Sequence, residues 1–206
     1  GSVEVSSMSR YDLKNLIATG ESSFLEFKHR VASPEKIAKE IAAFCNTTGG
    51  TILIGVADNG EMVGVESYME EEFWINQAAK EVCIPEVDLR IELMNIGNRD
   101  ILIVKVPEAP KKPVYLKGKK SRKVFIRQED ESVLASDEYV EMLKLGEEEE
   151  GVTFEYGENE QLLFRFLKEY SEITVERFSK LINVTTYRAA KILVNLVSAG
   201  VLDLFE

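Results

Sequence analysis

Near its start the chain gathers charged side chains in a pattern that could hold a metal ion. Glu26 and Lys28 are separated by one residue and share one face of a predicted strand over residues 24–29. Glu21 comes five residues earlier and joins them only if the chain bends in between. A carboxylate there could hold a hard cation through oxygen, while the lysine steadies a phosphate or an attacking water.

Asp58 is the third carboxylate of this hypothesis. It follows a nearly continuous apolar run over residues 51–56, which predicts a buried strand, and functional groups often gather where such strands end. Asp58 also directly precedes Asn59-Gly60, where an aspartate commonly accepts nearby backbone N–H groups. Two interpretations therefore stay open: a Mg²⁺ or Mn²⁺ site formed by Glu21, Glu26 and Asp58, or ordinary turn and strand residues.

A second cluster is basic. Residues 111–127 contain no acid, although the net charge of the chain is -11. The cations of this stretch are Lys111, Lys112, Lys117, Lys119, Lys120, Arg122, Lys123 and Arg127. A local basic stripe can meet phosphate even when the total charge is negative. The same lysines could instead protect an exposed strand edge from pairing.

Composition limits the classes to which the protein can belong. The chain has 206 residues, 45% of them hydrophobic, which is enough for a substantial core. No apolar run reaches the roughly 18 residues of a membrane span, and no secretory signal is present, so we predict a cytoplasmic protein. Cys45 and Cys83 are predicted to be reduced core residues. The chain lacks the Walker A and GxGxxG patterns, so ATP is not expected.

The order of the predicted elements favours an α+β fold with a mixed sheet flanked by helices. Ser33-Pro34 is a strong helix start, and apolar residues recur at helical spacing after it. Asn59-Gly60 predicts a hairpin turn followed by a return strand. Helices are predicted over residues 9–18, 34–46, 70–82 and 136–145, and strands over residues 24–29, 51–56, 62–65, 89–96, 101–106, 114–116 and 124–127.

The C-terminal part is predicted to be a separate small domain. We place the α+β domain at residues 9–145, an acidic linker at 146–157 and a helical domain at 158–206. Three helices and a terminal apolar segment outline a winged helix-turn-helix. Arg188 and Lys191 on its third helix could contact phosphate, although such a domain could equally mediate dimerisation.

Several ordered motifs resemble the Schlafen AlbA-type domain over residues 13–143. They are Glu21-Ser22-x-x-Leu25-Glu26-Phe27-Lys28, the segment from Ile41 to Gly50, Ile54-Gly55-Val56-x-Asp58-x-Gly60 and Phe125-Ile126-Arg127-Gln128. The resemblance implies an AlbA-like α+β fold. Prokaryotic members are described as nucleic-acid binders and transcriptional regulators, often with helix-turn-helix segments after the domain.

The same resemblance also implies an alternative. Some animal Schlafens are metal-dependent endoribonucleases whose two glutamates and one aspartate match Glu21, Glu26 and Asp58, with Lys28 as the lysine of the motif. This chain departs from the family, which often has Asp-Asp, by having Ala57-Asp58. It also carries one lobe where the animal enzymes carry two, and a homodimer could supply the second.

We therefore expect a nucleic-acid-binding transcriptional regulator whose partner is DNA or RNA rather than a membrane. The expected phosphate contacts are Lys117, Lys119, Lys120, Arg122, Lys123, Arg127, Arg188 and Lys191. A divalent-metal-dependent endoribonuclease and a protein-interaction module are the alternatives, so the sequence leaves open whether the protein is an enzyme.

Overall fold

The computed structural model describes residues 3–148, 158–198 and 202–203. The chain divides into two compact units, Gly1–Val140 and Glu141–Glu206. No helix in these described ranges is both long enough and apolar enough to cross a membrane.

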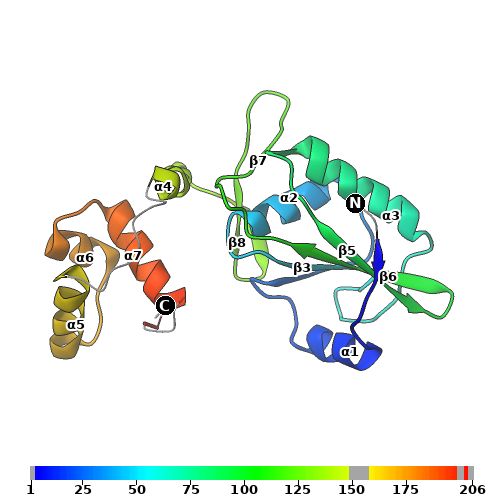
Figure 1. Ribbon diagram of the computed structural model, residues 1–206, viewed down its shortest axis with the longest axis horizontal. Coiled ribbons are helices and arrows are strands. Elements are labelled where there is room, and N and C mark those ends of the chain that lie inside the picture. Colours follow the sequence, from blue (N-terminus) through cyan, green and yellow to red (C-terminus); the bar gives the residue numbers. More distant parts are fainter. Residues whose placement is uncertain (1–2, 149–157, 199–201, 204–206) are drawn as a thin grey trace. The chain divides into compact units, whose positions relative to one another are not determined.

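The N-terminal unit is built on a five-stranded mixed sheet, and the predicted α+β class is confirmed (Figure 1). In spatial order its strands are β1 (Glu4–Val5), β5 (Arg90–Ile96), β6 (Arg99–Val106), β3 (Gly50–Ile54) and β2 (Leu25–Lys28). The two outer pairs, β1 with β5 and β2 with β3, are parallel, and the two inner pairs are antiparallel.

The parallel strands β2 and β3 are joined by α2 (Pro34–Cys45), as a parallel crossover requires. The helix begins where the sequence predicted, because the Ser33 hydroxyl accepts a hydrogen bond from the Lys36 N–H at 3.1 Å and Pro34 occupies the first turn. Its apolar stripe lies against the sheet, so Ile37, Ile41 and Phe44 are buried.

Helices cover both faces of this sheet (Figure 1). One face packs against α2, α3 (Tyr68–Gln77) and the π-helical turn η1 (Ala78–Val82), and the other against α1 (Arg10–Ala18). Side chains alternate between the faces along each strand. In β3, Ile52 and Ile54 therefore join the α2 core, whereas Leu53 joins the α1 core.

The return strand predicted after the Asn59-Gly60 turn is wrong. Residues 62–65 form no strand, and Met62 and Val65 make only isolated bridges to Val56 and Asp100. The physical reason is that both edges of β3 are already occupied, one by β2 and the other by β6. The Asn59-Gly60 turn is therefore followed by a single antiparallel bridge, between Val56 and Met62, and not by a full strand pair.

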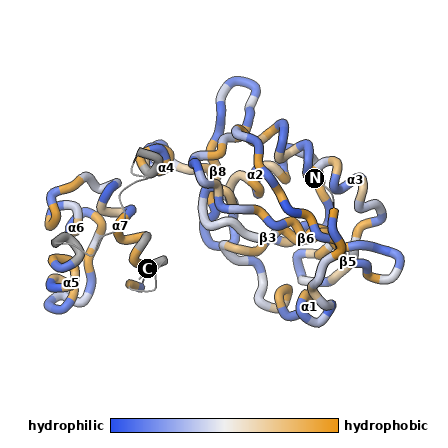
Figure 2. Tube along the Cα trace, in the orientation of Figure 1, coloured by the Kyte–Doolittle hydropathy of each residue, from blue (hydrophilic) through white to orange (hydrophobic). Residues whose placement is uncertain are grey.

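Two small strand pairs complete the N-terminal unit. β4 (Cys83–Ile84) pairs with β7 (Tyr115–Leu116), and β8 (Phe125–Gln128) pairs with β9 (Glu131–Leu134). Between β7 and β8 the chain makes a long projecting loop over residues 117–123, which we call the basic hairpin (Figure 1). Figure 2 shows this loop in the hydrophilic part of the colour scale, in contrast to the hydrophobic stretches of the sheet strands. The helix α4 (Asp137–Glu148) follows β9.

The C-terminal unit contains α5 (Glu158–Tyr170), α6 (Val175–Ile182) and α7 (Thr186–Ser198). Their core includes Leu163, Phe178, Ala189 and Leu196. α6 ends at Asn183 in the left-handed conformation, and the Thr185 hydroxyl accepts a hydrogen bond from the Arg188 N–H at the start of α7. The terminal apolar segment predicted to form the wing of the winged helix-turn-helix covers residues 201–205 and lies mostly outside the described residues. Within it, Leu202 and Asp203 are not in a strand.

Candidate functional site

The charged pair of the Glu-x-Lys segment faces α2. Because side chains alternate along β2, Leu25 and Phe27 join the α1 core while Glu26 and Lys28 point to the opposite face. Glu26 is only 7% exposed. The Lys28 Nζ lies 3.3 Å from Glu26 Oε1 and 3.5 Å from Oε1 of Glu40, a buried residue of α2.

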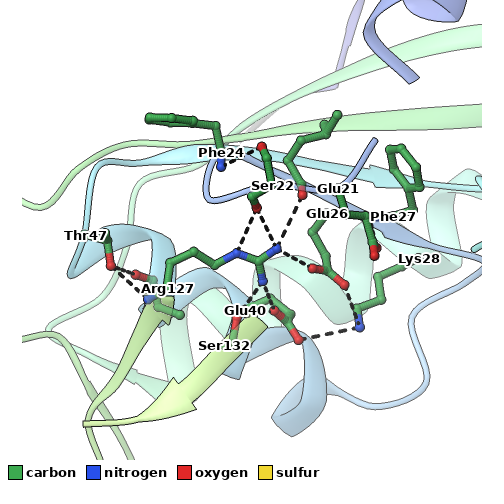
Figure 3. A network of polar contacts seen from close by, with 12 residues as sticks. Glu21, Ser22, Phe24, Glu26, Phe27, Lys28, Glu40, Thr47, Arg127 and Ser132 are labelled. Carbon is green, nitrogen blue, oxygen red and sulfur yellow. Dashed lines mark hydrogen bonds and ion pairs between the residues drawn. The ribbon is translucent and has the colours of Figure 1, made fainter. Parts of the chain in front are cut away.

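Arg127 of β8 lies at the centre of this cluster (Figure 3). Its side chain is 0% exposed. Its Nη2 donates to Glu26 Oε2 at 2.6 Å, and its Nη1 donates to Glu40 Oε2 at 3.1 Å. Nη2 also donates to the carbonyl oxygens of Ser22, at 3.0 Å, and Leu25, at 3.3 Å. Arg127 thereby fastens β8 to both β2 and α2.

Further contacts complete the surroundings of Arg127. Its guanidinium lies over the Phe44 ring, 4.7 Å from the centroid, and Nη1 donates to Ser132 Oγ at 3.0 Å. The Ser132 hydroxyl in turn donates to Glu40 Oε2. The Arg127 backbone N–H donates to Thr47 Oγ1 at 2.9 Å. We call Glu26, Lys28, Glu40, Arg127 and Ser132 the buried ion network.

The buried ion network balances two acids with two bases, and the surroundings shift the pKa values of Glu26 and Lys28. Burial, reinforced by the neighbouring Glu40, raises the pKa of Glu26 above its usual value, and the Arg127 contact only partly opposes this. Burial lowers the pKa of Lys28, but Glu40 and Glu26 together outweigh it and leave that pKa raised. Lys28 therefore stays protonated at neutral pH and bridges the two carboxylates.

Asn46, at the end of α2, is a second buried fastening point. Its Nδ2 donates to the carbonyl oxygens of Val114, at 3.0 Å, and Phe125, at 2.8 Å, and its Oδ1 accepts from the Val114 N–H at 2.6 Å. It therefore ties together the segments on both sides of the basic hairpin. Asn46, the C-cap residue of α2, therefore also helps to position the hairpin.

The structure does not gather the three predicted metal ligands. Glu21 and Asp58 line one open cavity of about 630 Å³ with Lys14 and Asp130, whereas Glu26 belongs to the buried ion network. Glu21 Oε1 accepts a hydrogen bond from the Phe27 N–H at 2.9 Å. Within the described residues no group of three His, Cys, Asp or Glu side chains is arranged to hold a metal ion. The metal site stays a prediction.

The basic hairpin presents its charges to solvent. Every residue from Lys117 to Lys123 is exposed, including the five cations, and within the described part of the chain none of these five forms a salt bridge. The hairpin is anchored at its base, because Leu116 and Lys123 exchange backbone hydrogen bonds of 2.8 and 3.1 Å. Lys117 N–H also donates to the Val82 carbonyl at 2.9 Å.

The other predicted phosphate contacts differ from the hairpin cations. Arg127 is enclosed, so its guanidinium is not available to phosphate in this structure, and it serves instead to hold β8. Arg188 and Lys191 lie on α7 of the C-terminal unit, where Arg188 is exposed and Lys191 partly exposed.

Sequence reasoning missed Glu40, Asn46 and Ser132. A signal for Glu40 was present: it lies on the apolar stripe of α2, three residues after Ile37 and four before Phe44, where a charged side chain needs a buried partner. No comparable signal marked Ser132, whose role depends on the pairing of β8 with β9.

Comparison with solved structures finds distant neighbours. One is the N-terminal domain of a putative ATP-dependent DNA helicase RecG-related protein from Nitrosomonas europaea, with 23% identity over 63% of this chain and 92% of that chain, at a TM-score of 0.47. Another is the DIP2311 protein from Corynebacterium diphtheriae, with 14% identity over 84% of this chain and 37% of that chain, at a TM-score of 0.46. No curated protein sequence shows significant similarity to the chain.

A family model gives the decisive match. The model of the Schlafen AlbA_2 family matches residues 21–136, which include the sheet strands β2, β3, β5 and β6, the buried ion network and the basic hairpin. The chain therefore belongs to the Schlafen AlbA_2 family, which indicates a function connected with nucleic acid.

Proposed function

We propose that the protein binds nucleic acid through the basic hairpin and acts as a transcriptional regulator. The observation that supports this is the set of five exposed cations at Lys117, Lys119, Lys120, Arg122 and Lys123, on a loop fixed at its base by backbone hydrogen bonds. Cations that are not engaged by protein carboxylates are free to replace the counterions of a phosphate backbone.

The fold supports the proposal by holding the hairpin in place. Asn46 bonds to residues before and after the loop, and Arg127 fastens the strand that leaves it. A fixed loop loses little conformational freedom on binding, so more of the electrostatic gain becomes affinity. Because the net charge of the molecule is -11, phosphate binding depends on local basic patches such as this one and not on the overall charge.

The test is the salt dependence of binding, measured by fluorescence anisotropy with labelled 20-nucleotide DNA and RNA probes. For Lys119→Gln/Lys120→Gln we expect weaker binding, with the slope of log K against log salt reduced by about 0.7 to 0.9 for each lost contact. The control is Lys36→Gln/Lys144→Gln, which removes the same charge from exposed lysines elsewhere. An unchanged slope in the hairpin variant, or an equal change in the control, would contradict the proposal.

The C-terminal unit offers a second contact in this proposal. Its helix pair α6 and α7 is joined by a short turn, as in helix-turn-helix proteins, and α7 carries Arg188 and Lys191. We propose that this unit binds DNA or forms a homodimer. Equilibrium sedimentation of the whole chain, with and without DNA, distinguishes the two.

One observation favours a second candidate, a metal-dependent endoribonuclease. Glu21 and Asp58 line the same open cavity, with Lys14 at its wall. The test is incubation with transfer RNA and Mn²⁺ on a denaturing gel, with EDTA, Glu21→Gln and Asp58→Asn as controls. Glu26→Ala is not diagnostic, since it would disturb the buried ion network. Discrete cuts that all three controls abolish would establish the enzyme, and RNA that stays intact would exclude it.

A further inference from the structure

Tyr115 lies at the entrance to the basic hairpin, with its ring partly exposed. It comes directly before Leu116, which is buried, so the two side chains of β7 point in opposite directions. Tyr115 lies outside the hydrophobic clusters found among the described residues. Its ring is therefore not needed to fill the core.

Arg122, on the other arm of the hairpin, lies over this ring. Its guanidinium carbon is 5.7 Å from the Tyr115 ring centroid. The bridge between Leu116 and Lys123, the residues that follow Tyr115 and Arg122 in the chain, fixes the two arms opposite each other. The pair is therefore assembled before any ligand arrives.

A similar pair lies at the other strand that flanks the hairpin. Lys39 Nζ is 5.9 Å from the ring centroid of Phe125, at the start of β8. Phe125 is partly exposed, although it also packs against the core on the α2 side of the sheet. Both strands that bound the basic hairpin thus begin with an aromatic residue whose ring lies beside a cation.

Flat aromatic and guanidinium surfaces beside a row of lysines are suited to bind single-stranded nucleic acid. Bases in a single strand expose their faces and can stack on such surfaces, whereas bases in a duplex are already stacked on one another. Charge alone works the other way, because a duplex has the higher density of phosphates. A preference for single strands would therefore require stacking.

We propose that the basic hairpin takes single-stranded DNA or RNA, with a base stacked on the Tyr115–Arg122 pair and the lysines on the adjoining phosphates. This inference rests on the proposed function and specifies its substrate class. It assigns Tyr115 and Arg122 to base contact, a role that general phosphate binding does not need.

The test compares three labelled probes of equal length by fluorescence anisotropy: a 20-nucleotide single strand, the same backbone with abasic sites throughout, and a 20-base-pair duplex. We expect the single strand to bind most tightly. Tyr115→Leu should weaken single-strand binding about 5- to 100-fold and change abasic and duplex binding by less than about twofold. Tyr115→Phe keeps the ring and should retain wild-type affinity.

Arg122→Lys provides a second variant, at an exposed position where folding is not at risk. It keeps the positive charge but removes the planar guanidinium group. It should therefore weaken binding of the single strand and leave the affinity for the abasic probe unchanged. Tighter binding of the duplex, or equal losses on the single-strand and abasic probes, would overturn this inference and leave the proposed function intact. No binding to any probe would overturn both.

Discussion

Arg127 shows why one residue type is needed at the centre of the buried ion network. Its guanidinium offers several donors in a fixed plane, and it uses them on two carboxylates, two backbone carbonyls and a hydroxyl. A lysine at this position would have a single nitrogen and could not reach these groups together. The basic stretch of the sequence therefore contains two kinds of cation, the enclosed Arg127 and the exposed residues of the hairpin.

Removal of Arg127 should destabilise the fold strongly. Arg127→Met leaves Glu26 and Glu40 buried, with only Lys28 as their cation, and breaking a buried pair in this way costs about 3 to 5 kcal/mol. The measurement is urea unfolding at pH 7. Arg122→Met, five residues earlier and exposed, is the matched control and should change the free energy of unfolding by less than about 0.5 kcal/mol. Similar losses of unfolding free energy in Arg127→Met and Arg122→Met would contradict the structural role of Arg127.

The raised pKa of Glu26 predicts a pH dependence of stability. The folded state holds this proton more tightly than the unfolded state, whose carboxyl titrates near 4.5. Between that value and the raised one the folded state binds more protons, so the contribution of Glu26 to stability falls as pH rises. The free energy of unfolding of the wild type, minus that of Glu26→Gln, should therefore decrease as the pH rises from 4.5. If this difference instead grows with pH, the pKa of Glu26 is not raised in the folded state.

At the scale of elements, the turn from α2 to β3 depends on Gly49. This residue has φ of +71°, and a Cβ there would lie 2.8 Å from the Val106 carbonyl oxygen and the Glu108 nitrogen. Only glycine combines this conformation with such a close approach. The turn therefore fixes where β3 enters the sheet beside β6.

Gly49→Ala should destabilise the protein more than Gly97→Ala. Both residues have a positive φ, but a Cβ at Gly97 meets nothing within 4 Å. We expect a loss of about 1 to 2 kcal/mol at Gly97 from backbone strain alone, and about 1 to 3 kcal/mol more at Gly49 from overpacking. Urea unfolding of the two variants measures the difference. Equal losses of unfolding free energy would show that the backbone near Gly49 shifts far enough to accommodate the added Cβ.

The elements themselves were largely predictable, because they depend on local signals. Ser33 and Pro34 mark the start of α2, and the apolar run from Thr51 marks β3. The strand order was not predictable, since it depends on which distant segments occupy the edges of β3. The same reason explains the wrong hairpin prediction, in which local turn chemistry was correct but the pairing position was already filled.

The candidate site was predictable only in part. Glu26 and Lys28 share a face as their spacing indicates, and the hairpin lysines are exposed. The sequence could not show that Glu26 pairs with Arg127, 101 residues away. It also grouped Arg127 with the hairpin cations, because a run of basic residues does not reveal where the chain turns inward.

At the scale of the whole molecule, the proposed single-strand site on the basic hairpin lies entirely in one unit. The sheet, the buried ion network and the basic hairpin all belong to Gly1–Val140. A fragment of residues 1–148 should therefore unfold cooperatively and retain single-strand affinity within about threefold of the whole chain. Circular dichroism and anisotropy measure these two properties. A loss above about tenfold would show that the C-terminal unit contributes directly to this site.

The position of Arg127 late in the chain also has a consequence for protein synthesis. The segments β2, α2 and β3 are complete at Ile54 and already contain Lys28, but the second cation that balances Glu26 and Glu40 is added 73 residues later. At the usual rate of translation this interval lasts roughly 4 to 15 seconds. During that time the nascent chain carries two carboxylates on its future core face, which should keep the partial domain soluble and open until β8 emerges from the ribosome.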